Sequence, residues 1–152
     1  MISDGVFVNG AQFQLTTAWT VGGGWEHFWL PNFSTAVYGT YTQVSYNDTV
    51  INSRWFCNGS GATNQNIRVA ANVTCDPGFN FWLIGTHTDW YPVAGFRLAV
   101  DVLYTRVQTA FDGQLVSLSK TQGARPTGIY LARDQGILAV TFRAQRTFVT
   151  GN

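Results

Sequence analysis

The residues best able to do chemistry in this sequence are two histidines, two cysteines and a small number of charged side chains. His87 and Asp89 stand two positions apart, a spacing that places both side chains on one face of a β-strand. A nearby serine would complete a Ser-His-Asp arrangement for acyl transfer, because the carboxylate orients the imidazole that activates the hydroxyl. Such a pair is more commonly part of a polar strand face that meets water, and we favour this interpretation over catalysis.

The cysteines and the glycine run indicate no cofactor. Cys57 and Cys75 lie 18 positions apart, which fits no zinc-binding spacing, and two ligands alone do not make a structural zinc site. Two interpretations remain open for them, a disulfide within residues 47–77 or two free thiols, and we predict the disulfide. The run Gly22–Gly24 lacks the Lys-Ser/Thr of a phosphate-binding loop, so we interpret it as close strand packing or a bend. The sequence thus predicts neither a metal nor an enzyme.

The composition narrows the class of protein. Charged residues make up 11% of the 152 residues, against roughly 25% in an ordinary soluble domain. The 15% aromatic content excludes disorder, and a single glutamate and a single lysine argue against a helical bundle. A net charge of +1 without a basic cluster argues against nucleic-acid binding. No apolar run approaches the roughly 18 residues of a spanning helix, whereas little charge and many aromatics suit a β-protein that faces lipid.

The elements that must position these residues are strands, because hydrophobicity alternates with period two. The clearest segment is 96–105, where one face carries Phe96, Leu98, Val100, Val102 and Tyr104, and the other carries Arg97, Ala99, Asp101, Leu103 and Thr105. Residues 138–148 alternate in the same way, and 19–29 and 80–90 do so less cleanly, with His27 falling on the apolar side. Such alternation is the signature of a strand between two different environments.

The lengths and connections of the segments favour a membrane barrel. With the aromatic and threonine-rich segment 33–46, there are five predicted strands of about 11 to 15 residues, whereas ordinary strands average about 5 to 6. Residues 31–32 and 92–95 are short connections, and residues 47–77 and 108–135 are long polar ones. Short turns that alternate with long loops are typical of outer-membrane barrels, and so are aromatic residues near strand ends.

Several motifs resemble the general diffusion porins of alphaproteobacteria such as rhizobia and Brucella. The motifs are Glu-His-Phe-Trp-Leu-Pro at 26–31, Tyr-Gly-Thr-Tyr at 38–41, Gly-Thr-His-Thr-Asp-Trp-Tyr-Pro-Val at 85–93, Asp-Val-Leu-Tyr-Thr-Arg-Val at 101–107, Gly-Ala-Arg-Pro-Thr-Gly at 123–128 and Arg-Ala-Gln-Arg-Thr-Phe at 143–148. They recur in the family's order over nearly the whole chain. His87 and Asp89 replace the family's usual Arg and Gln, and four residues follow Phe148, where the family ends on or near its terminal aromatic residue.

The resemblance implies a function and a set of partners. It implies a sixteen-stranded barrel, of which residues 1–152 would be a single domain forming the C-terminal portion, about five or six strands with two long outer loops. It also implies a multi-pass protein of the Gram-negative outer membrane, passive transport of small hydrophilic solutes and ions, and trimers. The partners would be outer-membrane lipid and missing N-terminal strands. The family's cysteine pair falls in the loop that holds Cys57 and Cys75, and Phe148 would be its barrel-assembly aromatic residue.

On this interpretation the inward faces present fixed charges to water, which orient and select ions. The predicted pore-lining residues are Glu26, His87, Asp89, Arg97, Asp101 and Arg143. Five strands is an odd number, whereas bacterial single-chain barrels have an even number. We therefore expect that upstream strands are missing, that residues 1–17 supply another strand, or that several chains combine.

Two other functions fit the sequence less well. The first is a secreted, disulfide-containing β-sandwich that acts as a binding module. Four glycosylation tripeptides, at Asn32, Asn47, Asn58 and Asn72, would suit such a protein. The second is a small closed barrel of eight short strands that serves as an adhesin or structural protein. Neither requires strands as long as those predicted here.

Overall fold

The protein is built from antiparallel β-sheets and one short helix in the computed structural model, which describes residues 4–8, 12–54, 56–57, 65–68, 74–118 and 126–148. In chain order the elements are β1 (Gly5–Phe7), β2 (Phe13–Leu15), β3 (Thr17–Leu30), β4 (Phe33–Ser45), α1 (Asp48–Ser53), β5 (Gln65–Arg68), β6 (Phe79–Val93), β7 (Phe96–Gln108), β8 (Leu115–Leu118), β9 (Gly128–Leu131) and β10 (Gln135–Arg146). The predicted all-β, antiparallel class is confirmed.

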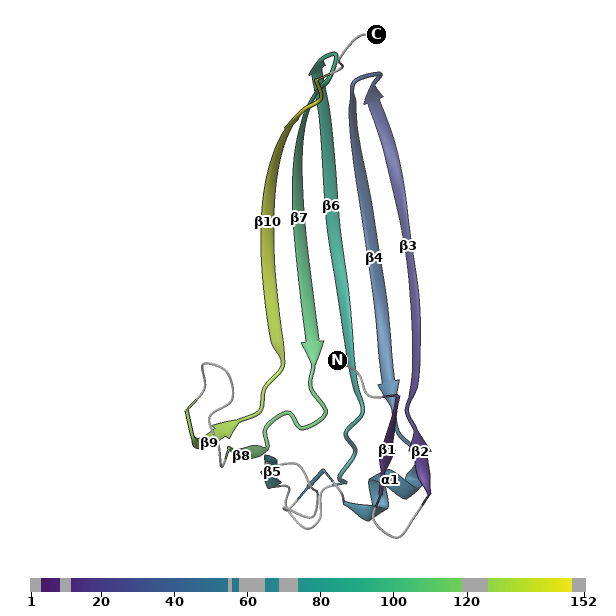
Figure 1. The fold of residues 1–152 in the computed structure, drawn as a ribbon, viewed down its shortest axis with the longest axis vertical. Coiled ribbons are helices and arrows are strands. Elements are labelled where there is room, and N and C mark those ends of the chain that lie inside the picture. Colours follow the sequence, from purple (N-terminus) through teal and green to yellow (C-terminus); the bar gives the residue numbers. More distant parts are fainter. Residues whose placement is uncertain are drawn as a thin grey trace. The chain divides into compact units, whose positions relative to one another are not determined.

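Five long strands form one sheet in the order β10-β7-β6-β4-β3, so that β3 and β10 are its edges (Figure 1). The strands contain between 12 and 15 residues each. They coincide with the five predicted strand segments, four of them alternating and the fifth, residues 33–46, aromatic and threonine-rich, and those strand predictions are confirmed. Alternation was a reliable guide because each of these strands separates two chemically different faces.

The ends of two strands differ from the predicted ones. β6 continues to Val93, which leaves a turn at residues 94–95 instead of the longer connection 92–95. Gly95 occupies the left-handed region at φ 74°, which a glycine adopts without steric cost. β10 ends at Arg146, so Phe148 lies beyond the strand and is 82% exposed. The backbone N–H of Thr147 nevertheless donates to the carbonyl of Gly95 at 2.8 Å.

The predicted long loops contain short elements that the sequence pattern did not reveal. β5, β8 and β9 form a three-stranded antiparallel sheet, and α1 begins after Asn47, whose side chain accepts a hydrogen bond from Val50 N at 3.1 Å. β1 and β2 pair with each other, so the described part of residues 1–17 adds no further long strand. None of the helices in the described ranges is long and apolar enough to cross a membrane.

The chain divides into two compact units, one of residues 1–19, 42–80 and 107–135 and the other of residues 20–41, 81–106 and 136–152. The clusters of buried hydrophobic residues found in the described residues belong to the first unit. One consists of Cys57, Cys75 and Phe111, and the other of Val6, Val8 and Val50. Cys57 and Cys75 form a disulfide, as predicted. A single domain over residues 1–152 stays a prediction.

Candidate functional site: a charged network on one face of the long sheet

Side-chain contacts divide the long sheet into two faces. On β6 and β7 the odd-numbered residues His87, Asp89, Arg97 and Asp101 contact one another. The even-numbered Trp82 and Tyr104 contact each other, with ring centroids 5.4 Å apart. Because side chains alternate along a strand, these two sets lie on opposite sides of the sheet. We call the side of His87, Asp89, Arg97 and Asp101 the polar face, and the side of Trp82 and Tyr104 the apolar face.

Asp89 is the most deeply buried member of the network on the polar face, at 7% exposure. Both of its carboxylate oxygens accept hydrogen bonds from Arg97, from Nε to Oδ1 at 2.5 Å and from Nη2 to Oδ2 at 2.8 Å. This bidentate geometry fixes the guanidinium plane and is among the stronger charge-assisted pairs in proteins. The ring of Tyr91 also lies 5.9 Å from Arg97 Cζ, within cation–π range. Arg97 is therefore held in place from two sides.

His87 links this pair to Asp101. Its Nδ1 contacts Asp101 Oδ1, while its Nε2 lies 2.9 Å from Asp89 Oδ2 and 3.0 Å from Arg97 Nη2. A neutral imidazole protonated on Nδ1 donates to Asp101 and accepts from Arg97 at Nε2. A doubly protonated imidazole instead donates to both carboxylates. The four groups carry a net charge of −1 in the first case and zero in the second, so the proton count of one ring sets the charge of the network.

The other two predicted pore-lining residues lie apart from this network. Glu26 is on β3 and Arg143 is on β10, the opposite edges of the sheet, and both are exposed. Glu26 falls opposite His27, whose ring stacks on Trp25 with centroids 5.2 Å apart on the apolar face. Arg143 has the same parity as Gln145 and Thr147, which share a small surface pocket with Arg97. By this parity both side chains lie on the polar face, and their place in a pore lining stays a prediction.

The apolar face exposes many large hydrophobic side chains. They are Trp19, Val21, Trp25, Trp29, Val37, Ile84, Trp90, Val100, Val102, Leu138, Val140 and Phe142, each between 37% and 66% exposed. Polar groups on this face near the turn at residues 31–32 bond to one another. The indole Nε1 of Trp29 donates to Thr35 Oγ1 at 3.2 Å, and Thr35 Oγ1 lies 3.3 Å from Thr88 Oγ1. A patch of this extent is unusual on a monomeric soluble protein.

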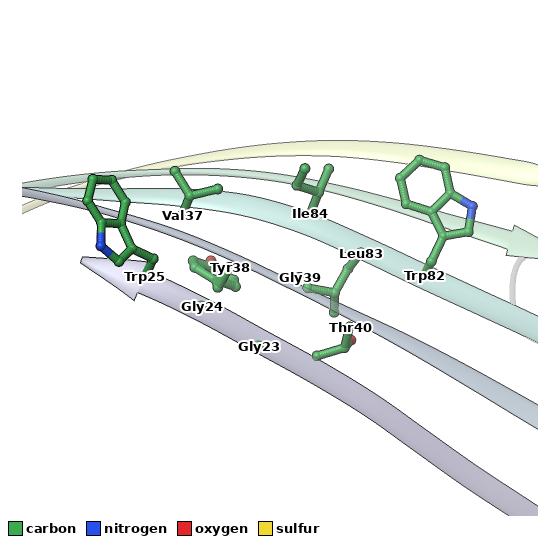
Figure 2. Close-up of a pocket in the computed structure, with 10 residues that line it drawn as sticks. All are labelled: Gly23, Gly24, Trp25, Val37, Tyr38, Gly39, Thr40, Trp82, Leu83 and Ile84. Atoms are coloured by element: carbon green, nitrogen blue, oxygen red, sulfur yellow. The ribbon is translucent and has the colours of Figure 1, made fainter. Parts of the chain in front are cut away.

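A groove of about 630 Å³ is associated with this face where β3, β4 and β6 lie side by side. Figure 2 shows Trp25, Val37, Ile84 and Trp82 rising from one side of these strands, with Tyr38 and Leu83 on the other. Gly23 and Gly39 also line the groove, and a Cβ at Gly23 would meet nothing within 4 Å. By contrast, a Cβ at Gly22 would lie 2.6 Å from Thr40 Cγ2. The close-packing interpretation of the glycine run is thus confirmed at Gly22, and Gly23 opens the groove.

The arrangement contains no nucleophile next to the imidazole. Within the described residues, the side-chain contacts of His87 go to Asp89, Arg97 and Asp101. The same residues include no group of three or more His, Cys, Asp or Glu side chains arranged to hold a metal ion. The network can hold charges of both signs at fixed positions, which attracts, orients and repels ions.

Sequence reasoning missed two parts of the site. Tyr91 supports Arg97. The signal for it was its odd residue number, which places Tyr91 on the same face of the strand as His87 and Asp89. The groove was missed because its residues come from three strands whose register the sequence did not specify. Comparisons of the chain with protein-family models, curated proteins and solved structures found no match.

Proposed function

We propose that this chain forms part of the wall of a β-barrel in the outer membrane of a Gram-negative bacterium, and that the barrel passes small hydrophilic solutes and ions by passive diffusion. The carrying observation is the division of the long sheet into an apolar face and a polar face. Barrels of this kind meet lipid on the outside and water on the inside, so their strands alternate in this way. The acidic residues of the five long strands, Glu26, Asp89 and Asp101, all lie on the polar face.

The dimensions of the strands support the proposal. A tilted transmembrane strand needs about 9 to 11 residues, and β4, one of the shorter strands of the sheet, has 13. The hydrogen bonds among Trp29, Thr35 and Thr88 support it as well, because a hydroxyl facing hydrocarbon without a partner is costly. Each strand would thus cross the membrane once.

The polar face would line an aqueous lumen with fixed charges. Arg97 and Arg143 attract anions, whereas Glu26 and Asp101 attract cations. Asp89 is paired with Arg97 in two hydrogen bonds, so these two charges largely offset each other at long range. Selection would then depend on pore radius and on the less strongly paired charges. No bond is broken, and no cofactor takes part.

Closure of the barrel requires further strands. Neighbouring strands in the five-stranded sheet are antiparallel, so the two edges, β3 and β10, run in the same direction (Figure 1). An antiparallel partner for both edges is possible only if an odd number of strands is added. Unpaired edges in lipid cost several kcal/mol per backbone group. The resemblance noted above names N-terminal porin strands as the source, and trimers as the assembly.

Conductance across planar bilayers tests this function. The chain is expressed in a Gram-negative strain together with the additional strands that close its barrel, extracted from the membranes in mild detergent and added to the bilayer. We expect uniform conductance steps. The variant Arg143→Glu should shift the zero-current potential in a salt gradient towards cation preference, and Arg143→Lys should not. A protein that stays soluble without detergent and gives no steps would contradict the proposal.

The alternative is a secreted β-sandwich that acts as a binding module. The Cys57–Cys75 disulfide and its small hydrophobic cluster favour it, because disulfides are common in secreted domains. A sandwich, however, covers the apolar face of each sheet with another sheet, and in the described residues side chains such as Trp25 and Phe142 are 65% and 66% exposed. A monodisperse protein in buffer without detergent would favour this alternative.

A further inference from the structure

Charge is distributed unevenly over the apolar face. Ionisable side chains in the five long strands are few, and their parity assigns each to one face. The acidic ones all fall on the polar face. Apart from tyrosines, those on the apolar face are His27, Arg106 and Arg146. In the described part of the sheet, the apolar face therefore offers positive charge and hydrogen-bond donors, and no carboxylate.

Two tryptophans hold the ring of His27 in place on this face. Its imidazole stacks on Trp25 with centroids 5.2 Å apart and an interplanar angle of 26°, and it meets Trp29 edge-on with centroids 4.4 Å apart. Unlike the other residues of β3, which are exposed, His27 is half-buried. The two indoles fix the plane of the ring, so that its N–H groups have a defined direction. Tryptophan pairs of this kind are common where a membrane protein meets the headgroup region.

The groove adjoins this position through a shared residue. Trp25 stacks on His27 and also lines the groove, which extends along β3 and β4 away from the turn at residues 31–32. Beyond Trp25 the groove is bounded by Val37 and Ile84, and Gly23 leaves its floor open. The imidazole of His27 thus lies next to one end of the groove, which has a volume of about 630 Å³.

We propose that this face binds one phosphate-bearing lipid of the surrounding membrane, with an acyl chain in the groove and the phosphate accepting a hydrogen bond from His27. The inference rests on the proposed function, which turns this face towards lipid. Charge complementarity selects the occupant, because a phosphate suits a face that carries two arginines and an imidazole and, in the described strands, no carboxylate. A second copy that packed face to face would bring the same groups together without a carboxylate to meet them.

Tryptophan quenching by brominated lipids tests the proposal. The barrel formed by the chain and its additional strands is placed in vesicles of digalactosyldiacylglycerol, a bilayer lipid without phosphate, that contain a minor fraction of a lipid brominated on its acyl chains, either phosphatidylglycerol or digalactosyldiacylglycerol. Bromine quenches a nearby indole, so the quenching reports which lipid occupies the surface next to the tryptophans. We expect the phosphate-bearing lipid to associate about fivefold more strongly than the galactolipid, the size of one net hydrogen bond.

Four variants localise the effect. His27→Phe keeps an aromatic ring between the tryptophans but removes the N–H. The ratio of the association constants of the two lipids should therefore fall towards one. Gly23→Leu fills the floor of the groove, where a Cβ meets nothing, and should weaken quenching by both lipids at this site. Val21→Leu, on the same face but outside the lining of the groove, should change neither. His27→Gln retains an N–H donor and should keep most of the preference.

The outcomes separate this proposal from the function on which it rests. No quenching by any brominated lipid would mean that the face does not meet lipid, and the proposed function would fail. Equal quenching by both lipids, unchanged in His27→Phe, would leave the membrane assignment intact and overturn the lipid site. A change of oligomeric state in Gly23→Leu, without a change in lipid preference, would assign the groove to a second copy and also overturn it.

Discussion

Tyr38 lies directly over Gly85: a Cβ at Gly85 would come within 2.6 Å of Tyr38 Cζ and 2.7 Å of its hydroxyl oxygen. The two residues belong to neighbouring strands, β4 and β6, and both lie on the polar face. Gly85 is buried although it has no side chain, because the tyrosine ring covers its backbone. The Tyr38 ring can therefore occupy this position only because residue 85 is a glycine.

Replacing Gly85 by alanine should destabilise the sheet. The added methyl group forces the Tyr38 ring away, and overpacking of this kind costs about 1–3 kcal/mol. Gly23→Ala is the matched control, because its Cβ enters open space. Urea unfolding in lipid vesicles, followed by tryptophan fluorescence, measures the difference. Equal midpoints for the two variants would show that the ring does not pack on Gly85.

The pair Asp89 and Arg97 should carry most of the stability of the charged network. Asp89→Asn removes one charge-assisted acceptor and leaves the guanidinium half-buried without its counter-charge, so we expect a loss of about 1–3 kcal/mol. Glu26→Gln removes the same charge at an exposed edge position and should cost within about 0.5 kcal/mol. Both variants should shift ion selectivity towards anions. If Glu26→Gln is the more destabilising of the two, the network does not have this role.

The sequence predicts the long strands of this structure well, but not its short elements or the pairing of its charges. Four of the long strands were predictable because residues such as Val100 and Asp101 need different environments, and alternation then indicates both strand and face. The fifth, in residues 33–46, was predictable as a strand from its composition, but its faces were not. The short elements were not, since three or four residues, as in β5 or β9, are too few to show a period. The charges of the network were predictable by face. Their pairing was not, because the partner of Asp89 depends on a register set by the turn at Gly95.

Adjacent positions on β10 should respond oppositely to the same substitution. Val140 is 65% exposed on the apolar face, and the exposed Thr141 lies on the polar face. Val140→Arg places a charge in hydrocarbon, which costs about 2–4 kcal/mol near the middle of the membrane, whereas Thr141→Arg meets water. We expect the first to reduce the heat-resistant fraction on cold gels and the second to alter conductance. An exchange of these phenotypes would mean that the faces are assigned the wrong way round.

β10 suits this comparison better than β7. From the sequence alone, Ala99 on β7 is an equivalent polar-face position. In the structure Ala99 is 1% exposed and stands between Arg97 and Asp101 on the same face. An arginine there would displace the network, so a stability loss would not report on lipid.

The disulfide should stabilise the unit that contains it. Cys57 and Cys75 close a loop of 18 positions and lie in a cluster with Phe111. In the chain-entropy model a loop of this size contributes about 3 kcal/mol. The double variant Cys57→Ser and Cys75→Ser should therefore expose this unit to limited proteolysis while the long sheet stays protected. Two reactive thiols in the denatured, unreduced protein would contradict the bond itself.

The last prediction concerns the open edges of the sheet. Expressed without any additional strands, the 152 residues should not form a stable monomeric pore. The reason lies in topology: β3 and β10 run in the same direction, so they cannot pair antiparallel with each other. Copies of this sheet that all cross the membrane in the same direction would therefore be parallel at every junction. Lipid offers no hydrogen bonds to those edges. We therefore expect aggregates, or assemblies without uniform conductance steps.

Co-refolding is the measurement that checks this topology. Adding a separate fragment with an odd number of antiparallel porin strands should restore heat-resistant barrels and conductance. A fragment with an even number should not, because one edge would still lack an antiparallel partner, and this fragment is the matched control. The parity argument depends on the strand order alone and is independent of the identity of the added strands. A lone chain that gives a heat-modifiable monomer with steady single-channel steps would show that the edges close in another way and that the strand count proposed for the wall is wrong.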